Sequence, residues 1–362
     1  MHGGVRMQKK LKPNISGIFG ITVTVLVFIG LLIYPDKASQ GVKSGLQLLF
    51  STVIPSLFPF AVLSSYISSG GFADAAVKLT GRRFSKIFKA PPEGCLAFLL
   101  GITGGYPIGA KTAAELYSQN IISKQDARRL VLWCVNAGPA FTVSAVGVSM
   151  MGNIKAGFIL YAGTVISALT LGLCCRFLPQ SDGAAQKPAA AKTARRRDGA
   201  LIFSVTEGSR AILGISAWVL CFSCLSSLVQ TLPLDTYSVR FIKSVLEVTT
   251  GCRCFAAEYP LPVTAAMLGF GGLCVICQVM PYLNKTGASF KEFAVSRIVS
   301  AALNAFYVSV LCKIFPLTVS VNTDLTQKIP VLPFSGGIPA CIILIIMCVL
   351  LILEVDNNEK VC

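Results

Sequence analysis

Charged residues are scarce in this chain. Asp, Glu, Lys and Arg together make up 13% of its 362 residues, whereas 54% are hydrophobic and the mean hydropathy is +0.70. So few polar side chains cannot cover the surface of a soluble domain. The composition therefore excludes a soluble globular protein and predicts an all-α polytopic membrane protein in contact with the lipid bilayer.

Residues that hold metals or perform catalysis are also few. Histidine occurs once, as His2, and most of the 14 Cys lie within apolar runs, where a free Cys behaves as a small hydrophobe. Cys252 and Cys254 are the nearest approach to a metal motif. We expect no zinc site, no disulfide scaffold and no cofactor. The chain also lacks a G-x-x-x-x-G-K-[ST] loop and a recognisable catalytic triad, so neither an ATP-driven pump nor an enzyme is expected.

One apolar stretch, residues 99–115, reads LLGITGGYPIGAKTAAE. Gly and Pro at this density open the helical backbone, which is tolerated at membrane depth only where protein buries it or water lines it. The stretch predicts a broken or re-entrant element of the kind that turns half-helix ends toward a substrate in transporters. A flexible kink in an ordinary span is the plainer alternative. Residues 241–254, too short to cross and containing Glu247, predict a second such element.

Eight apolar segments predict membrane-spanning helices, at residues 15–34, 45–68, 131–151, 157–178, 209–232, 260–283, 293–315 and 338–353. The first is too long for a cleavable signal peptide and has no matching cleavage site. We divide the chain into an N-terminal transmembrane anchor (1–44), a first repeat (45–178), a flexible basic linker (179–200), a second repeat (201–315), and a C-terminal loop with the last transmembrane helix (316–362).

The two repeats are indicated by weak matches that keep their order along the chain. Residues 100–105 match 246–251, residues 137–139 match 271–273, and residues 164–169 match 298–303. Each half then consists of a span, a broken element and two further spans. The sequence thus predicts about eight transmembrane helices plus two re-entrant broken elements.

The basic residues predict how the repeats are oriented. They form short clusters between apolar runs, which is typical of membrane orientation and argues against nucleic-acid binding. With a cytoplasmic N-terminus, 24 of the 32 Lys and Arg lie on the cytoplasmic side, as does the C-terminus. This layout requires the broken elements to enter from opposite sides, so that the repeat is inverted. If both elements crossed fully instead, the Arg195 cluster would lie outside.

Polar groups within the apolar runs mark the candidate site, because such groups are costly in a membrane. Free backbone N–H groups at half-helix starts favour an anion, and a nearby lysine adds to this, so we expect a small organic anion as substrate. The predicted substrate-binding residues are Gly104, Gly105, Tyr106, Pro107, Gly109, Lys111, Asn136, Gly138, Thr249, Thr250, Gly251 and Gln278, and the candidates for coupling to a proton or cation are Glu115 and Glu247.

Three of these residues have plainer interpretations. Lys111 is also explained as a lysine that extends its amine to the membrane interface. Glu115 lies four residues on and could simply neutralise it. For Asn136, a hydrogen bond between helices is the alternative to a role in binding.

Six strings carry a resemblance to a known family. They are GITGGYPIGAK at 101–111, ISKQD at 122–126, CVNAGP at 134–139, AVGV at 145–148, LEVTTG at 246–251 and FGGLCVICQ at 270–278. In them the chain resembles the sporulation integral membrane proteins of the nucleoside-recognition, or Gate-domain, family, over residues 40–315, which makes both repeats Gate-like. The linker at 179–199 and a second half with few polar residues depart from the family pattern.

The resemblance implies a protein of the outer membrane around the forespore, which moves dipicolinic acid, a small aromatic dianion, from the mother cell to the forespore. The backbone at 104–109 and Lys111 would bind a carboxylate, Tyr106 would stack on the ring, and Asn136 and Gln278 would bond its polar edges. A nucleoside carrier and a non-transporting scaffold for spore-envelope assembly are the alternatives. A homo-oligomer and a sporulation membrane partner are both left open.

Overall fold

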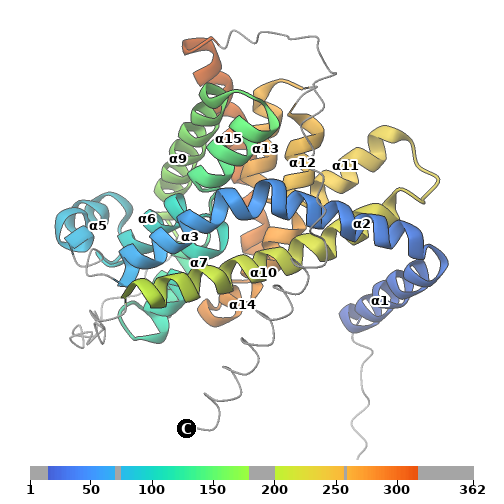
Figure 1. Cartoon of the computed structure of the whole chain (residues 1–362). Helices are drawn as coiled ribbons and strands as arrows, with labels where there is room; N and C mark the ends of the chain where they lie inside the picture. The colour runs from blue at the N-terminus through green and yellow to red at the C-terminus, as the bar shows by residue number, and fades with distance from the viewer. Residues whose placement is uncertain (1–14, 70–74, 179–199, 257–258, 317–362) are drawn as a thin grey trace, which may run out of the picture. The chain divides into compact units, whose positions relative to one another are not determined.

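The computed structural model describes residues 15–69, 75–178, 200–256 and 259–316, and within these every regular element is a helix (Figure 1). Five helices are long and apolar enough to cross a membrane: Pro35–Leu63, Ile154–Cys175, Leu201–Val229, Leu261–Thr286 and Phe290–Ile314. The prediction of an all-α polytopic membrane protein is confirmed. The predicted span at 338–353, the linker at 179–199 and the basic N-terminus at 1–14 lie outside the described residues.

In the first half, α1 is followed by a long helix in which α2 continues through the π-helical turn η1 into α3. Its elements are α1 (Ile15–Ile33), α2 (Pro35–Leu48), η1 (Leu49–Val53), α3 (Ile54–Ser69), η2 (Val77–Gly81), α5 (Arg82–Phe88), α6 (Gly94–Gly104), α7 (Tyr106–Ser118), α8 (Lys124–Val131), η3 (Ala140–Met150) and α9 (Ile154–Cys175). The second half contains α10 (Ala200–Val229), α11 (Thr236–Leu246), α12 (Val248–Phe255), α13 (Leu261–Phe270), α14 (Gly272–Thr286) and α15 (Phe290–Ile314).

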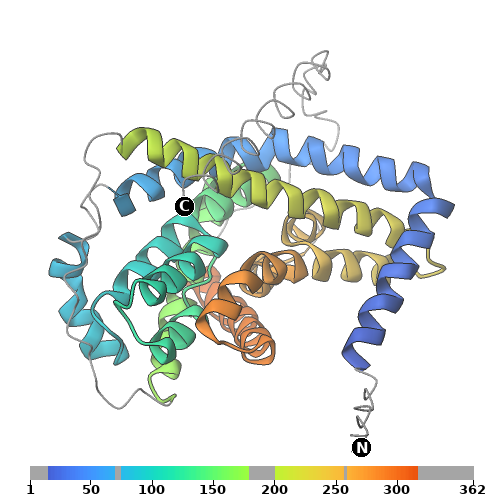
Figure 2. The ribbon, with the colours of Figure 1, turned by 90° about the horizontal axis from the view of Figure 1, so that it is seen from below.

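The first long helices of the two halves lie side by side and antiparallel (Figure 2). Gly41 of α2 lies against Ser227 of α10, whereas Gly208, near the start of α10, lies against Val62 of α3. The helices that end the two halves, α9 and α15, also pack together. The opposite direction of α2–α3 and α10 is what an inverted repeat requires of equivalent elements.

Two predicted spans are broken instead of continuous. Residues 131–151 comprise the end of α8, a non-helical segment at 132–139 and the short helix η3, and residues 260–283 break at Gly271. Gly271 and Gly272 have φ angles of 80° and 76°, a left-handed conformation that favours glycine. Each half therefore consists of a long helix, two interrupted helices and a long helix. In the second half, Leu261–Thr286 and Phe290–Ile314 are both long and apolar enough to cross, as the predicted order with two final spans requires.

Both predicted breaks are confirmed, although helix ends differ. The first falls at Gly105 and the second at Glu247. Lys111 does not end the first element, because α7 continues to Ser118. Helix α15 begins at Phe290, three residues before the predicted span, and it contains Arg297.

The basic segment at 77–89 forms an amphipathic helix that packs on the core. Phe84 and Phe88 are buried with their ring centres 5.7 and 4.9 Å from that of Trp133, whereas Arg82 and Lys86 are exposed. Part of the apolar face is therefore covered by the protein itself. This packing places α5 beside the segment at 132–139, which contains Trp133.

Candidate functional site

The four broken helices contribute to one cavity of about 50 Å³, which three of their interruptions line directly, whereas the fourth helix lines it beyond its interruption, from Cys274 onward. The four interruptions are Gly105 between α6 and α7, the segment at 132–139 between α8 and η3, Glu247 between α11 and α12, and Gly271 between α13 and α14. The residues that line this central cavity are Val53, Leu57, Gly104, Gly105, Tyr106, Pro107, Gly138, Ala140, Phe141, Ile215, Val219, Glu247, Val248, Thr249, Cys274, Val275 and Gln278. Both halves thus contribute to it.

Within each half, the two interruptions touch through a glycine. A Cβ atom on Gly138 would lie 3.0 Å from the backbone nitrogen of Gly105, and one on Gly272 would lie 3.1 Å from that of Val248. The structure therefore supports the match of Gly138 with Gly272. The match of residues 100–105 with 246–251 is shifted, because it places Gly101, and not Gly105, opposite Glu247.

Tyr106, predicted to stack on the substrate, joins the two halves at this cavity. Its hydroxyl donates a 2.8 Å hydrogen bond to the carbonyl oxygen of Leu268, near the end of α13. Its ring meets that of Phe141 edge-on at 6.4 Å and lines the cavity. The ring is therefore available at the cavity wall while the hydroxyl is occupied.

The helix starts at the cavity differ between the halves. Helix α12 is capped by the carboxylate of Glu247, which accepts hydrogen bonds from the backbone N–H groups of Thr249 at 2.8 Å and Thr250 at 2.6 Å. Helix α7 starts after Gly105 and has no side-chain cap. Because N–H groups at a helix start carry partial positive charge, they attract carboxylates. The second half holds its own carboxylate at this position, and the first half leaves the equivalent position without one.

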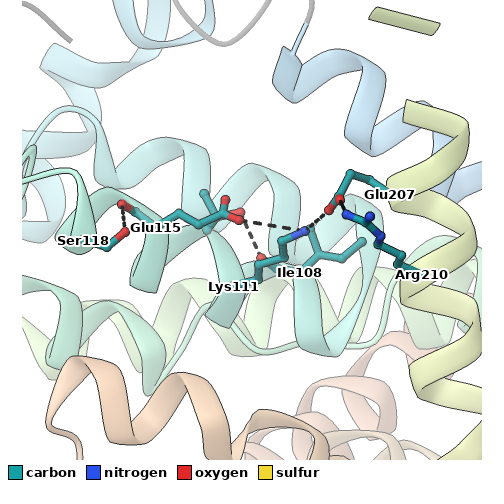
Figure 3. A network of polar contacts seen from close by, with 7 residues as sticks. Ile108, Lys111, Glu115, Ser118, Glu207 and Arg210 are labelled. Atoms are coloured by element: carbon teal, nitrogen blue, oxygen red, sulfur yellow. Dashed lines mark hydrogen bonds and ion pairs between the residues drawn. The ribbon is translucent and has the colours of Figure 1, made fainter. Parts of the chain in front are cut away.

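Lys111 lies outside the central cavity, in an adjoining hollow of about 320 Å³ that we call the vestibule. Its amine lies 2.5 Å from a carboxylate oxygen of Glu207 on α10 and 3.8 Å from one of Glu115 (Figure 3). Arg210 donates a hydrogen bond of 3.0 Å to the other oxygen of Glu207. Lys111 is therefore paired with an acidic residue of the other half, which the sequence analysis did not identify.

The remaining predicted residues have the following positions. Gln278 lines both the cavity and the vestibule. Asn136 is buried and donates to the carbonyl oxygen of Trp133 at 2.8 Å, a local bond that holds the non-helical segment. Gly109 packs against the carbonyl of Cys134, and Gly251 packs against Ser244. Apart from Gln278, these residues shape the backbone around the cavity without lining it.

Arg297 is a structural residue that the sequence analysis missed. Its side chain, 1% exposed, lies in α15 and donates hydrogen bonds to the carbonyl oxygens of Val135 and Leu132, the latter at 2.8 Å. These carbonyls belong to the non-helical segment of the first half and have no helical partner of their own. An arginine within an apolar helix is itself a signal, because such residues almost always face a partner inside the protein.

Metal-ligating residues do not gather at this site. Among the described residues, no group of three or more His, Cys, Asp or Glu is placed to hold a metal ion. Two Cys-x-x-Cys spacings that we did not single out, Cys221 with Cys224 and Cys274 with Cys277, form no such group either. The chemistry of the site therefore rests on backbone ends, one carboxylate, one amide and aromatic rings.

Comparison with known proteins agrees with the motifs. Residues 50–154 match the Gate family model, described as nucleoside recognition. The chain is 25% identical over 322 residues to the sporulation integral membrane protein YlbJ of Bacillus subtilis (strain 168). This match covers 77% of this chain and 79% of YlbJ. No solved structure matches. The resemblance is confirmed: the chain is an integral membrane protein in which residues 50–154 match the Gate model, and it is similar to YlbJ over most of its length.

Proposed function

We propose that this protein is a membrane carrier for a small organic anion, which binds where the four interrupted helices meet. The observation that carries the proposal is that the interrupted helices of both halves line one cavity, three of them at the interruption itself. Backbone that leaves the helical pattern at membrane depth is a recurring feature of substrate sites in transporters built from inverted repeats.

The charge at the helix starts favours an anion. Glu247 occupies the start of α12 with a carboxylate, whereas the start of α7 has no side-chain cap. A carboxylate of the substrate at the start of α7 would be attracted by the partial positive charge of that helix start. It would not form the same pair of bonds, because Pro107 has no N–H and the N–H of Ile108 bonds the carbonyl oxygen of Gly105. Tyr106 and Phe141 then offer ring surfaces, and the amide of Gln278 offers a hydrogen bond.

Dipicolinate is the substrate that we propose. It is a planar aromatic dicarboxylate, so it suits a helix start beside aromatic rings. The similarity to a sporulation integral membrane protein supports a role in a spore-forming bacterium, in the outer forespore membrane. In that membrane, the side of the carrier that holds both termini would face the cytoplasm of the mother cell.

Binding would require the site to open. The cavity of about 50 Å³ has room for only a few water molecules, less than an aromatic dicarboxylate occupies. Carriers of this architecture expose their central site by moving one part of the structure against the other. The described conformation would thus be one in which the central site is too small to hold the substrate.

A nucleoside is the second candidate substrate. The description of the Gate segment as nucleoside recognition favours it, and Gln278 and Thr249 could bond a neutral base or sugar. A nucleoside carrier should not need the positive charge of Lys111. A scaffold for spore-envelope assembly would move neither compound.

The test is uptake by liposomes that contain the purified protein, with labelled dipicolinate and a labelled nucleoside in parallel. We expect saturable uptake of dipicolinate that excess unlabelled dipicolinate suppresses. Uptake of the nucleoside alone would overturn the substrate and keep the carrier, whereas uptake of neither would favour the scaffold. Liposomes without protein provide the background.

A further inference from the structure

The vestibule adjoins the central cavity and is lined by groups that suit an aromatic anion. Pro107, Ile215 and Gln278 line both spaces, so the two are direct neighbours. Helices α7, α10 and α14 form the walls of the vestibule. Trp218 and Tyr282 supply aromatic rings, while Lys111 and Arg210 supply positive charge. A ligand moving to the cavity through this space would meet those cations first.

The vestibule carries an internal carboxylate on these cations. Glu207 binds Lys111 through one oxygen, at 2.5 Å, and Arg210 through the other, at 3.0 Å (Figure 3). Glu115 lies 3.8 Å from the same amine. The two cations and two carboxylates cancel, so that no net positive charge is left over for an arriving dianion.

We infer that the vestibule is an outer binding site for the transported anion, in which Glu207 is a built-in competitor that the carboxylates of the anion displace from Lys111 and Arg210. This inference rests on the proposed function, because it names a second position for the same substrate. Displacement breaks no covalent bond. The cations exchange one carboxylate partner for another, and Glu207 turns to solvent.

The exposure of the three side chains makes this exchange inexpensive. Lys111 is 38% exposed, Arg210 41% and Glu207 17%. Ion pairs that water reaches contribute only about 0–1 kcal/mol. A free dianion at millimolar concentration can therefore compete with Glu207, whereas it could not replace a fully buried pair at similar cost.

The inference predicts opposite effects of removing the two partners of one ion pair. Glu207→Gln removes the competitor, so we expect dipicolinate to bind about fivefold more tightly. Lys111→Gln removes a cation, so we expect binding about fivefold weaker, and Arg210→Gln should change it in the same direction. The measurement is equilibrium binding of labelled dipicolinate to the purified protein, alongside uptake into liposomes.

A pair elsewhere in the chain provides the matched control. Arg128 of α8 and Glu292 of α15 also join the two halves, at a position that lines neither the cavity nor the vestibule. Glu292→Gln should leave dipicolinate binding unchanged, since Gln also completes the capping box with Ser289. The thermal stability of each variant, measured in detergent, separates folding from binding.

The outcomes separate this inference from the proposed function. If the wild-type protein neither binds nor transports dipicolinate, the proposed function fails first. If the wild-type protein does both while Glu207→Gln weakens binding as Lys111→Gln does, the pair is structural and the outer site is overturned. Glu207→Ala removes the same carboxylate and gives the same test if the glutamine variant does not fold.

Discussion

The hydroxyl of Tyr106 donates a 2.8 Å hydrogen bond to the carbonyl oxygen of Leu268, 162 residues further along the chain. Tyr106 is the first residue of α7, and Leu268 lies in the last turn of α13. The bond therefore connects an interrupted helix of the first half to one of the second, at the wall of the central cavity. Both residues are buried, so water does not replace the bond when it is lost.

Tyr106→Phe removes this bond and keeps the ring. We expect the free energy of unfolding to fall by about 1 kcal/mol, the usual contribution of such a hydrogen bond. Thermal unfolding in detergent measures that change. Dipicolinate binding should stay close to wild type, because the ring at the cavity wall is unchanged. Tyr106→Leu, which also removes the ring, should weaken dipicolinate binding. Equal binding by both variants would exclude stacking on Tyr106.

The sequence predicts an interruption well where local residues cause it. Gly104, Gly105 and Pro107 stand together in one apolar run, and the segment that holds Glu247 is too short to span a membrane. The interruptions at 132–139 and Gly271 lie in runs long enough to cross, so length favours a continuous helix there. Besides the local bond of Asn136, the segment at 132–139 receives hydrogen bonds from Arg297. This arginine lies more than 150 residues away, so no local pattern reveals the contact.

The residues of the candidate site were likewise predictable where a local signal marks them, and not where the contact joins the two halves. Gly105, Tyr106, Gly138, Glu247 and Gln278 all line the cavity, since each stands at an interruption or is a polar residue in an apolar run. The partner of Lys111 was not predictable, because Glu207 lies 96 residues away in the other half. Within its own segment, Lys111 has only Glu115 as an acidic neighbour, and pairing between the halves depends on the tertiary fold.

Arg297→Met tests whether the arginine holds the non-helical segment. The substitution keeps an unbranched side chain but leaves the buried carbonyls of Leu132 and Val135 without their donors. Each unsatisfied group costs about 1–3 kcal/mol, and relief of the buried charge offsets part of this, so we expect a loss of about 3 kcal/mol. Unfolding temperature and the yield of folded protein measure it. The exposed Arg128→Met is the control, and an equal, small change in both variants would contradict the role.

Gly101→Ala tests the close packing of α6 against the segment at 132–139. A Cβ atom on Gly101 would overlap the carbonyl oxygen of Cys134, and one on Gly109 would do the same from α7. Because the overlap is with backbone, we expect either variant to lose several kcal/mol of stability or to fail to fold. Gly214→Ala on α10 meets no atom within 4 Å and should be stable or slightly stabilised. Wild-type stability of Gly101→Ala would show that the packing is looser than described.

Glu247→Gln tests whether this buried carboxylate couples transport to protons. Gln retains an oxygen that accepts a backbone hydrogen bond, so the start of α12 should stay capped and the protein folded. If Glu247 is the coupling residue, uptake of dipicolinate by the wild-type protein should respond to an imposed proton gradient, whereas uptake by the glutamine variant should be insensitive to it. Glu115→Gln, which changes the half-exposed second candidate, is the control. If Glu247→Gln keeps the full response and Glu115→Gln loses it, the coupling residue is Glu115.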